Sequence, residues 1–481
     1  FFFGLFLTPC VLSCRVVGMA VDQIPEGPPI ITEAIWDRWV KYPHPIAVKV
    51  QHKGLHTTKE SVVGRQLQQL ERSTTVQDFL VAYVAALKKW NGMSIFKNIS
   101  YSLEPAADNK GFVANIEFVE KNEKSAGVSI QREASCTTPE VRFSDNNLFG
   151  RAWEGTLMAQ GPMESHRQVS FSLRNKNPAF GKWQEWSLFN RSRTSDFHSL
   201  KRHNAKGVSF GTDLDLAEQL GDHYFELGYE IRDAQPDKDE RVSDALACDR
   251  GESDKAYLRH DCTLSRLSQG PDERFPKGLH LWVSNEVGGV ANIVKHDVKA
   301  DYYLPLLPNS LASLSLHLKA GLIWAFGDQT RIRVNDRYSL DSTFVRGYRG
   351  IGPGAPDILN PPPISDPPGE QPGGNVMGAV SASLNFPIPG SSVITGHCFA
   401  NMGNLQYSEK KEEVFTQEYL QQFIKGAKSS VGVGMVFHVL PLMYGRLEFN
   451  AAFPLEKNGP MMRPAGHVFD RFKLGLQWSN T

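Results

Sequence analysis

The sequence lacks an apolar run long enough to cross a bilayer as a helix, because such a helix needs about 18 or more apolar residues. Only the segment 1–14 approaches that length. We expect residues 1–41 to be a leader or linker, in which this segment is either a secretory signal or a leader upstream of a start at Met19. If the chain spans a membrane, it must do so as strands, since only helices and closed barrels satisfy every backbone group in lipid.

The sequence also lacks an excess of charge of either sign. Its 52 Lys and Arg residues balance 52 Asp and Glu residues, which removes the long-range field typical of a nucleic-acid binder. The six cysteines do not have the paired spacing of a zinc site, and the sequence contains neither a P-loop nor an H-E-x-x-H motif. We therefore expect no nucleic-acid partner, no metal, no cofactor and no enzymatic activity.

Residues 42–122 are predicted to form a small α+β domain with the order strand, helix, helix, strand, strand. Thr57 with Glu60 and Thr75 with Asp78 have the spacing of capping boxes, which predicts two helix starts. The second helix is expected to bury a stripe made of Val76, Leu80, Val84 and Leu87. A generic α+β domain is the plainest interpretation, and its open sheet edge would allow a peptide partner to add a strand.

From about residue 126 onward, apolar and polar residues alternate with a period of two, which is typical of strands. The clearest segment is 314–326, where Leu, Ala, Trp and Phe alternate with Ser, His, Lys and Gly. Its length favours a membrane strand, which needs about 9–11 residues, over a sandwich strand of about 5–6 residues. The last segment is of the same kind, and a chain that ends in such a strand can close a barrel against its first strand. The alternative is a large soluble β-sandwich or propeller.

One motif resembles a hydrolase site. Residues 207–211 match G-x-S-x-G, with Ser209 in the position of the nucleophile. The motif requires a helix directly after the serine, whereas alternating residues continue from Thr212 to Leu216. We therefore interpret Ser209 as a strand residue that faces the lumen of a barrel.

A second motif lies between a predicted strand and a segment rich in Pro and Gly. Val345, Arg346, Gly347 and Tyr348 resemble the (V/I)-R-G-(F/Y) signature in the sixth loop of the outer-membrane barrel-insertase superfamily. An Arg beside a conformationally free Gly can dock its planar fork on carboxylates or carbonyls. Further resemblances to that superfamily lie at 147–150, 373–375, 399–404 and 446–450.

The resemblance implies a mainly β fold: a POTRA domain at 42–122, then a transmembrane β-barrel at 126–481 of about sixteen antiparallel strands. It implies a long sixth loop at about 341–374 that folds into the lumen, with Arg346 anchored on the inner wall. Candidate partners for Arg346 are Asn385, Asn401 and Glu448. The seam that closes the barrel would involve the last strand, at Phe472, Leu474, Gly475, Leu476 and Trp478.

A single POTRA domain most resembles the branch that serves the mitochondrial sorting and assembly machinery. This resemblance implies an integral barrel of the mitochondrial outer membrane whose POTRA domain faces the intermembrane space. The barrel would insert β-barrel precursors by strand pairing at a lateral seam. Its partners would be those precursors, other subunits of an outer-membrane assembly complex and the lipid bilayer. The alternatives are a polypeptide-translocating pore of the same superfamily and a bacterial outer-membrane barrel insertase.

Overall fold

The computed structural model describes residues 47–479, apart from short gaps in the connections and longer gaps at 354–371 and 456–470. The leader or linker expected at 1–41 lies outside the described residues. Contacts divide the chain into two compact units, a small amino-terminal unit and a large β unit, which are described separately below. Among the described residues, no helix is long and apolar enough to cross a membrane.

The amino-terminal domain is a sheet with two α-helices. In chain order its elements are β1 (Ala47–Lys53), the 3₁₀ turn η2 (Glu60–Val62), α2 (Gly64–Glu71), α3 (Val76–Gly92), β2 (Phe96–Pro105) and β3 (Gly111–Glu120). The sheet order is β1-β3-β2, with β1 parallel to β3. The rings of Phe79 and Phe112 meet edge to face, with centroids 5.2 Å apart, and both side chains are fully buried. Aromatic pairs of this geometry add stability beyond the area they bury.

Two local predictions for this domain differ from the structure. The capping box at Thr57 does not form, because Lys59 precedes η2 and gives no side-chain cap, while the Thr57 N–H donates to Glu120 Oε2 at 2.9 Å. The expected stripe of α3 is right only in part, because Val76 is buried whereas Val84 is 64% exposed. The buried face carries aromatic side chains, which have more apolar area to remove from water than Val or Leu. It consists of Val76, Phe79, Tyr83, Ala86 and Trp90.

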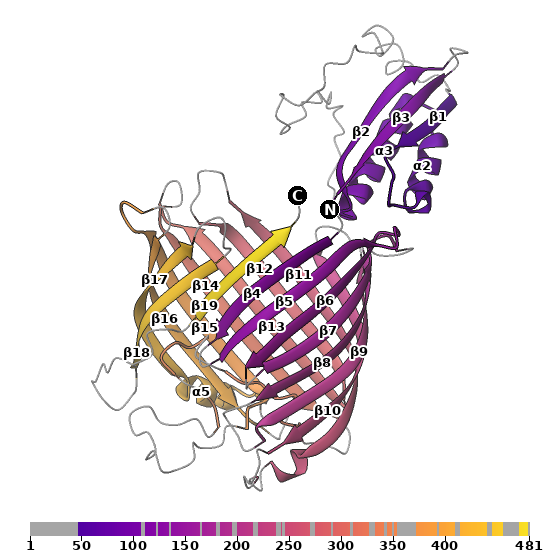
Figure 1. The fold of residues 1–481 in the computed structure, drawn as a ribbon. Coiled ribbons are helices and arrows are strands. Elements are labelled where there is room, and N and C mark those ends of the chain that lie inside the picture. Colours follow the sequence, from indigo (N-terminus) through magenta and orange to yellow (C-terminus); the bar gives the residue numbers. More distant parts are fainter. Residues whose placement is uncertain are drawn as a thin grey trace, which may run out of the picture. The chain divides into compact units, whose positions relative to one another are not determined.

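The large unit is a closed antiparallel barrel of sixteen strands in the described residues, β4 to β19 (Figure 1). Each strand pairs with its neighbours in the chain, and β19 pairs with β4 to complete the ring. The predicted fold class is therefore confirmed, and the sandwich or propeller alternative is wrong. The strands are β4 (Lys124–Glu133), β5 (Cys136–Leu148), β6 (Trp153–Met163), β7 (His166–Asn175), β8 (Trp183–Thr194), β9 (Arg202–Leu214), β10 (Asp222–Gln235), β11 (Gly251–Ser268), β12 (Lys277–Gly288), β13 (Ile293–Pro305), β14 (Ser313–Ala325), β15 (Val376–Pro387), β16 (Ile394–Gln406), β17 (Lys428–Val439), β18 (Gly445–Leu455) and β19 (Arg471–Ser479).

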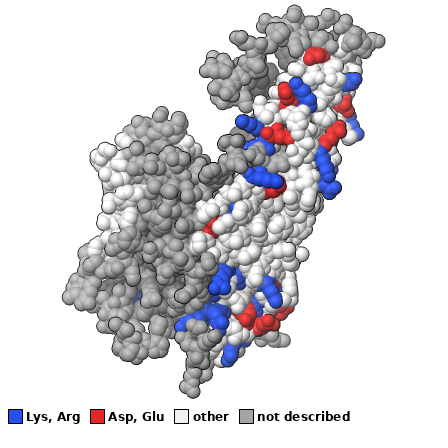
Figure 2. Space-filling view, viewed as in Figure 1, with Lys and Arg blue, Asp and Glu red and all other residues white. Residues whose placement is uncertain are grey.

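The outer wall of the barrel exposes large apolar side chains at alternate strand positions. Examples from different strands are Val208, Leu227, Leu258, Val380 and Val433, which are between 43% and 61% exposed. On the visible part of the wall in Figure 2, a band without charged residues separates charged side chains near its edges. Exposed apolar area of this extent is unfavourable in water. In lipid it is the ordinary outer surface of a transmembrane barrel.

Candidate functional site

The connection between β14 and β15, called loop six here, folds into the barrel lumen. It runs from 326 to 375, so it begins earlier than the expected 341–374. Its residues 334–340 line one cavity together with side chains from β5 to β13, and this arrangement is possible only from inside the ring. Apolar side chains of the loop pack against the inner wall at Met377, Ala379 and Leu405. The loop members of this cluster are Ile332, Tyr338, Leu340, Val345, Tyr348 and Ile351.

Arg346 lies against β16. Its Cζ atom is 4.5 Å from the ring centroid of Phe399, the distance of a cation–π contact. In one orientation of the Asn401 amide, its oxygen accepts from Arg346 Nη1 at 3.4 Å. In the other orientation, it accepts from the Arg346 backbone N–H at 3.2 Å. Asn401 therefore contacts Arg346 in either assignment of the amide.

The neighbours of Arg346 extend the contact to β17 and β18. Ser430 Oγ donates to the Arg346 carbonyl at 2.6 Å, and the Tyr348 hydroxyl donates to the Ser429 carbonyl at 2.9 Å. Gly347 has φ +89°, and a Cβ there would lie 3.1 Å from the Cβ of Ala452. Both the backbone conformation and the close approach require glycine at this position. The four motif residues thus form one docking unit on β16, β17 and β18.

Of the other two candidate partners of Arg346, Asn385 has a different partner, and the side chain of Glu448 is not described. Asn385 in β15 donates through Nδ2 to Ser315 Oγ of β14 at 2.7 Å. Glu448 lies in β18, opposite Arg471 of β19, but its side chain lies outside the described residues. Ser209 is in the middle of β9 and lines the lumenal cavity, and the strand continues past it to Leu214.

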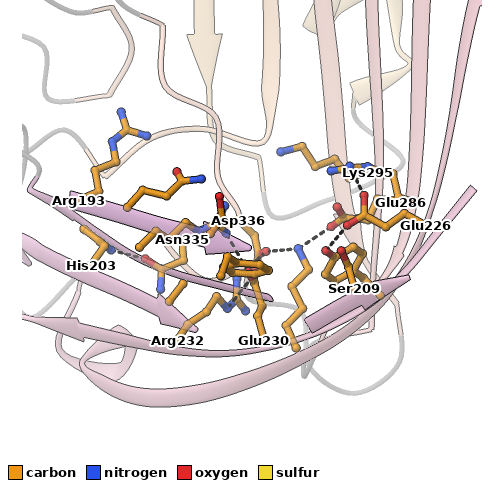
Figure 3. A pocket seen from close by; sticks show the side chains of 18 of the residues that line it. Arg193, His203, Ser209, Glu226, Glu230, Arg232, Glu286, Lys295, Asn335 and Asp336 are labelled. Carbon is orange, nitrogen blue, oxygen red and sulfur yellow. Dashed lines mark hydrogen bonds and ion pairs between the residues drawn. The ribbon is translucent and has the colours of Figure 1, made fainter. Parts of the chain in front are cut away.

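A second contact of loop six is an ion cluster that involves Asp336 (Figure 3). Asp336 Oδ1 accepts from Arg232 Nη1 of β10 and from Lys255 Nζ of β11, both at 2.8 Å. The three side chains are only 5–8% exposed. Lys255 also pairs with Glu286 of β12 at 2.5 Å, and Arg232 Nε lies 3.7 Å from Glu230 Oε1. The cations are therefore compensated by carboxylates on both the loop and the wall.

The charge of Asp336 depends on this cluster. Burial opposes its ionisation, but Lys255 and Arg232 outweigh that effect and hold the pKa of the carboxyl below its usual value. A lowered pKa means that the contribution of the pair to stability is present at neutral pH and is lost only as the pH falls through the lowered value. The contact should therefore persist in mildly acidic solution.

Loop six thus reaches across the lumen from β10 and β11 to β16, the sixth strand after β10 in the ring. Near its first contact, Arg337 Nη2 lies 3.6 Å from Asp249 of the β10–β11 connection. A cavity of about 860 Å³ remains beside the loop. Its lining is largely polar and includes Ser172, Glu185, Ser209, Glu226, Arg259 and Asn335.

The ring closes where β19 pairs with β4. The pairing is antiparallel and covers nine residue pairs, from Arg471 opposite Glu133 to Ser479 opposite Ser125. On its other side, β19 pairs with β18 over three residue pairs in the described part of the chain. The expected seam residues lie in β19, opposite β4 positions, although their side chains lie outside the described residues. The Cα partners are Phe472 with Arg132, Leu474 with Ile130, Gly475 with Ser129, Leu476 with Val128 and Trp478 with Ala126.

Comparison with known families agrees with this geometry. The Omp85 superfamily domain matches residues 147–476, which is more than half of the chain. This chain belongs to the Omp85 superfamily. Membership supports a role in protein insertion or translocation at an outer membrane, in general terms. No curated protein matches the sequence.

One solved structure shows the same fold, and two others are less similar. BamA from Haemophilus ducreyi lacking POTRA domains 1–3 is similar, with a TM-score of 0.71 and 17% identity over 90% of this chain and 85% of that chain. CdiB from Acinetobacter baumannii has a TM-score of 0.49 and 10% identity over 91% of this chain and 74% of that chain. CdiB from Escherichia coli has a TM-score of 0.47 and 12% identity over 90% and 77% of the two chains.

Sequence reasoning missed the ion cluster of this Omp85 barrel. A partial signal was present, because Glu226, Glu230 and Arg232 occupy one face of β10 while Leu227 and Tyr229 occupy the other. That alternation places charges in the lumen. It does not show that Asp336, which follows Arg232 by 104 residues, meets them there.

We predict that Asp336→Asn destabilises the barrel, because it leaves Arg232 and Lys255 buried with fewer compensating charges. Breaking a buried ion pair in this way costs about 3–5 kcal/mol. The measurement is the free energy of unfolding in detergent. The folded fraction is determined on cold gels from the difference in mobility between the folded and the unfolded barrel. Asp254→Asn is the matched control, because Asp254 is an exposed carboxylate beside Lys255 in the same strand. Equal stability of both variants would contradict a role for the ion cluster in holding the loop.

Proposed function

We propose that this chain inserts β-barrel precursors into the mitochondrial outer membrane by strand pairing at the β4–β19 seam. The observation that carries the proposal is the β4–β19 junction, which joins the first and the last strand of the barrel through nine antiparallel residue pairs. Separation of β4 from β19 would expose unpaired N–H and C=O groups along β4. Such an edge is a template for an incoming strand.

The other parts of the site support the same proposal. Loop six is held inside the lumen by polar contacts with β10 and β11 and, at the Arg346 motif, with β16 and β17, so it can keep these parts of the wall in shape while the seam opens. The amino-terminal domain, which we interpret as a POTRA domain, has β1 and β2 at the edges of its sheet. Either edge could receive an extended segment of a precursor by strand addition.

A translocating pore is the second candidate function, and the polar cavity of about 860 Å³ beside loop six favours it. In a pore, the substrate would pass through the lumen while the seam stays shut. In an insertase, the seam itself must open. The two functions therefore differ in what happens when the seam is locked.

We predict that a disulfide between Val128→Cys and Leu476→Cys abolishes precursor assembly. These positions are direct Cα partners across the seam, and opposite residues of antiparallel strands are about 4.5–5.5 Å apart, which suits a disulfide. Assembly of a radiolabelled precursor is measured before and after reduction, in a background without the six native cysteines. Reduction should restore assembly.

The matched control is a disulfide between Leu318→Cys and Val380→Cys, which are Cα partners in β14 and β15. This lock lies away from the seam and should leave assembly unchanged. Full assembly activity with the seam locked would rule out the insertase, and continued passage of a polypeptide under the same lock would favour the pore.

We predict that Arg346→Ala impairs precursor assembly while the amino-terminal domain stays folded. The substitution removes the contact with Asn401 and the stacking over Phe399. Arg346→Lys is the informative companion, because an ammonium keeps the charge but loses the planar fork and its stacking. Assembly rates are compared with amide-exchange protection of α3 and β3. Normal assembly by Arg346→Ala would refute the anchoring role.

The mitochondrial location is the finer part of the proposal and rests on the resemblance of the domain arrangement described above. We predict that the tagged protein fractionates with mitochondrial outer membranes and resists extraction by alkaline carbonate. Protease should reach the amino-terminal domain only after the outer membrane is ruptured. Fractionation with a bacterial-type outer membrane would instead support the bacterial insertase alternative.

A further inference from the structure

Helix α5 (Gln417–Lys425) lies in the connection between β16 and β17 (Figure 1). It carries an apolar face that is covered only in part. Thr416 caps the helix, because its Oγ1 accepts the N–H of Tyr419 at 3.2 Å. The apolar residues follow the spacing that places them on one side of a helix. They are Tyr419, Leu420, Phe423 and Ile424.

The helix packs on the outer wall of the barrel. In β15, Met377 and Ala379 face the loop-six cluster inside the lumen, so Gly378 between them points outward. A Cβ on Gly378 would lie 3.1 Å from Cε1 of Phe423. The side chain of Phe423 therefore occupies the space that glycine leaves on the outer surface.

A second contact confirms this position. In β16, Gly403 and Leu405 face loop six, so Asn404 between them also points outward. Its Nδ2 donates to the Phe423 carbonyl at 2.6 Å, and Asn404 is only 5% exposed. An amide on a lipid-facing wall needs such a partner, and the helix provides it.

The rest of the apolar face is exposed. Leu420 is 56% exposed and Ile424 is 54% exposed, while Phe415, just before the helix, is 72% exposed. The ring of Phe415 lies 6.2 Å from that of Trp324, an outward residue between Ile323 and Ala325 of the lumenal cluster. The opposite side of α5 is polar and consists of Gln417, Glu418, Gln421, Gln422 and Lys425.

We propose that α5 is an interfacial helix whose exposed apolar residues lie in the lipid at the boundary between headgroups and acyl chains. We assign lipid to this face because its exposed residues continue the outer wall of β15 and β16. On that wall, Val380 follows the covered Gly378 by two positions and Met402 precedes the covered Asn404 by two, and both are exposed. Amphipathic helices bind this boundary with the apolar face about 5–10 Å deep. The inference rests on the barrel fold and not on the proposed insertase function.

The test is site-directed spin labelling of the whole protein in phosphatidylcholine–phosphatidylethanolamine vesicles. Labels are placed with Leu420→Cys and Ile424→Cys in a background without the six native cysteines. Val380→Cys provides a lipid-facing reference, and Gln417→Cys and Gln421→Cys provide the matched polar face. We expect labels at 420 and 424 to be several-fold more accessible to oxygen than to a water-soluble nickel complex, with the order reversed at 417 and 421.

Equal exposure of all four helix labels to the nickel complex would overturn the proposal, because α5 would then lie in water. Immobile labels at 420 and 424 that neither reagent reaches would also overturn it, because a second copy of the chain would then cover the face. The label at 380 shows in the same experiment whether the barrel has inserted.

A second measurement uses the wild-type chain and needs no cysteine replacement. A phospholipid with a photoactivated diazirine near the ester groups is added to the vesicles, and modified positions are mapped by mass spectrometry. We expect modification at Phe415, Leu420 or Ile424 and none at Gln417 or Gln421. Labelling of barrel strands without any labelling of α5 would reject the lipid contact.

Discussion

The constraint on which this structure depends is that lipid offers no hydrogen-bond partner to a peptide group. Each strand of the wall must be paired on both sides, so the sheet has to close. Fifteen of the sixteen junctions in the ring join strands that follow each other in the chain, and the remaining junction joins β19 to β4. That junction brings together the two ends of the barrel sequence. It is the junction that can separate without a connecting loop to limit the opening.

Closure also decides what the inside of the barrel contains. Residues that alternate with the lipid-facing ones point into the lumen, where charges such as Arg232 and Lys255 are shielded from lipid but have little contact with water. Buried cations of this kind require carboxylates nearby. Loop six supplies one of them, Asp336, and β12 supplies another, Glu286. Because a buried ion pair gains little net stability over apolar packing, its main effect here is to determine where the loop lies.

The two contacts of loop six differ in their physical character. At Asp336, charge meets charge at 2.8 Å, and the side chains of Asp336 and Arg232 are almost fully buried. At Arg346, the contacts of the guanidinium with described residues include an amide and an aromatic ring, and a neutral acceptor binds it less strongly than a carboxylate would. The second contact is strengthened by its neighbours, since Ser430 and Tyr348 add hydrogen bonds to the backbone. The loop is therefore held by charge at its beginning, and by several hydrogen bonds and a cation–π contact around the motif.

The sequence by itself determined the wall of this Omp85 barrel, because a period of two over segments as long as 314–326 suits a strand with lipid on one side. It also indicated Arg346 and Gly347 through a short motif. It did not determine which face of α3 is buried, because Val84 and Tyr83 are both acceptable apolar residues until the sheet is present. Only the tertiary structure decided that Asp336 meets Arg232 and Lys255, and that α5 lies on the outer wall over Gly378. Local patterns record which residues share a face of one element, whereas contacts between distant segments depend on how the closed ring brings those faces together.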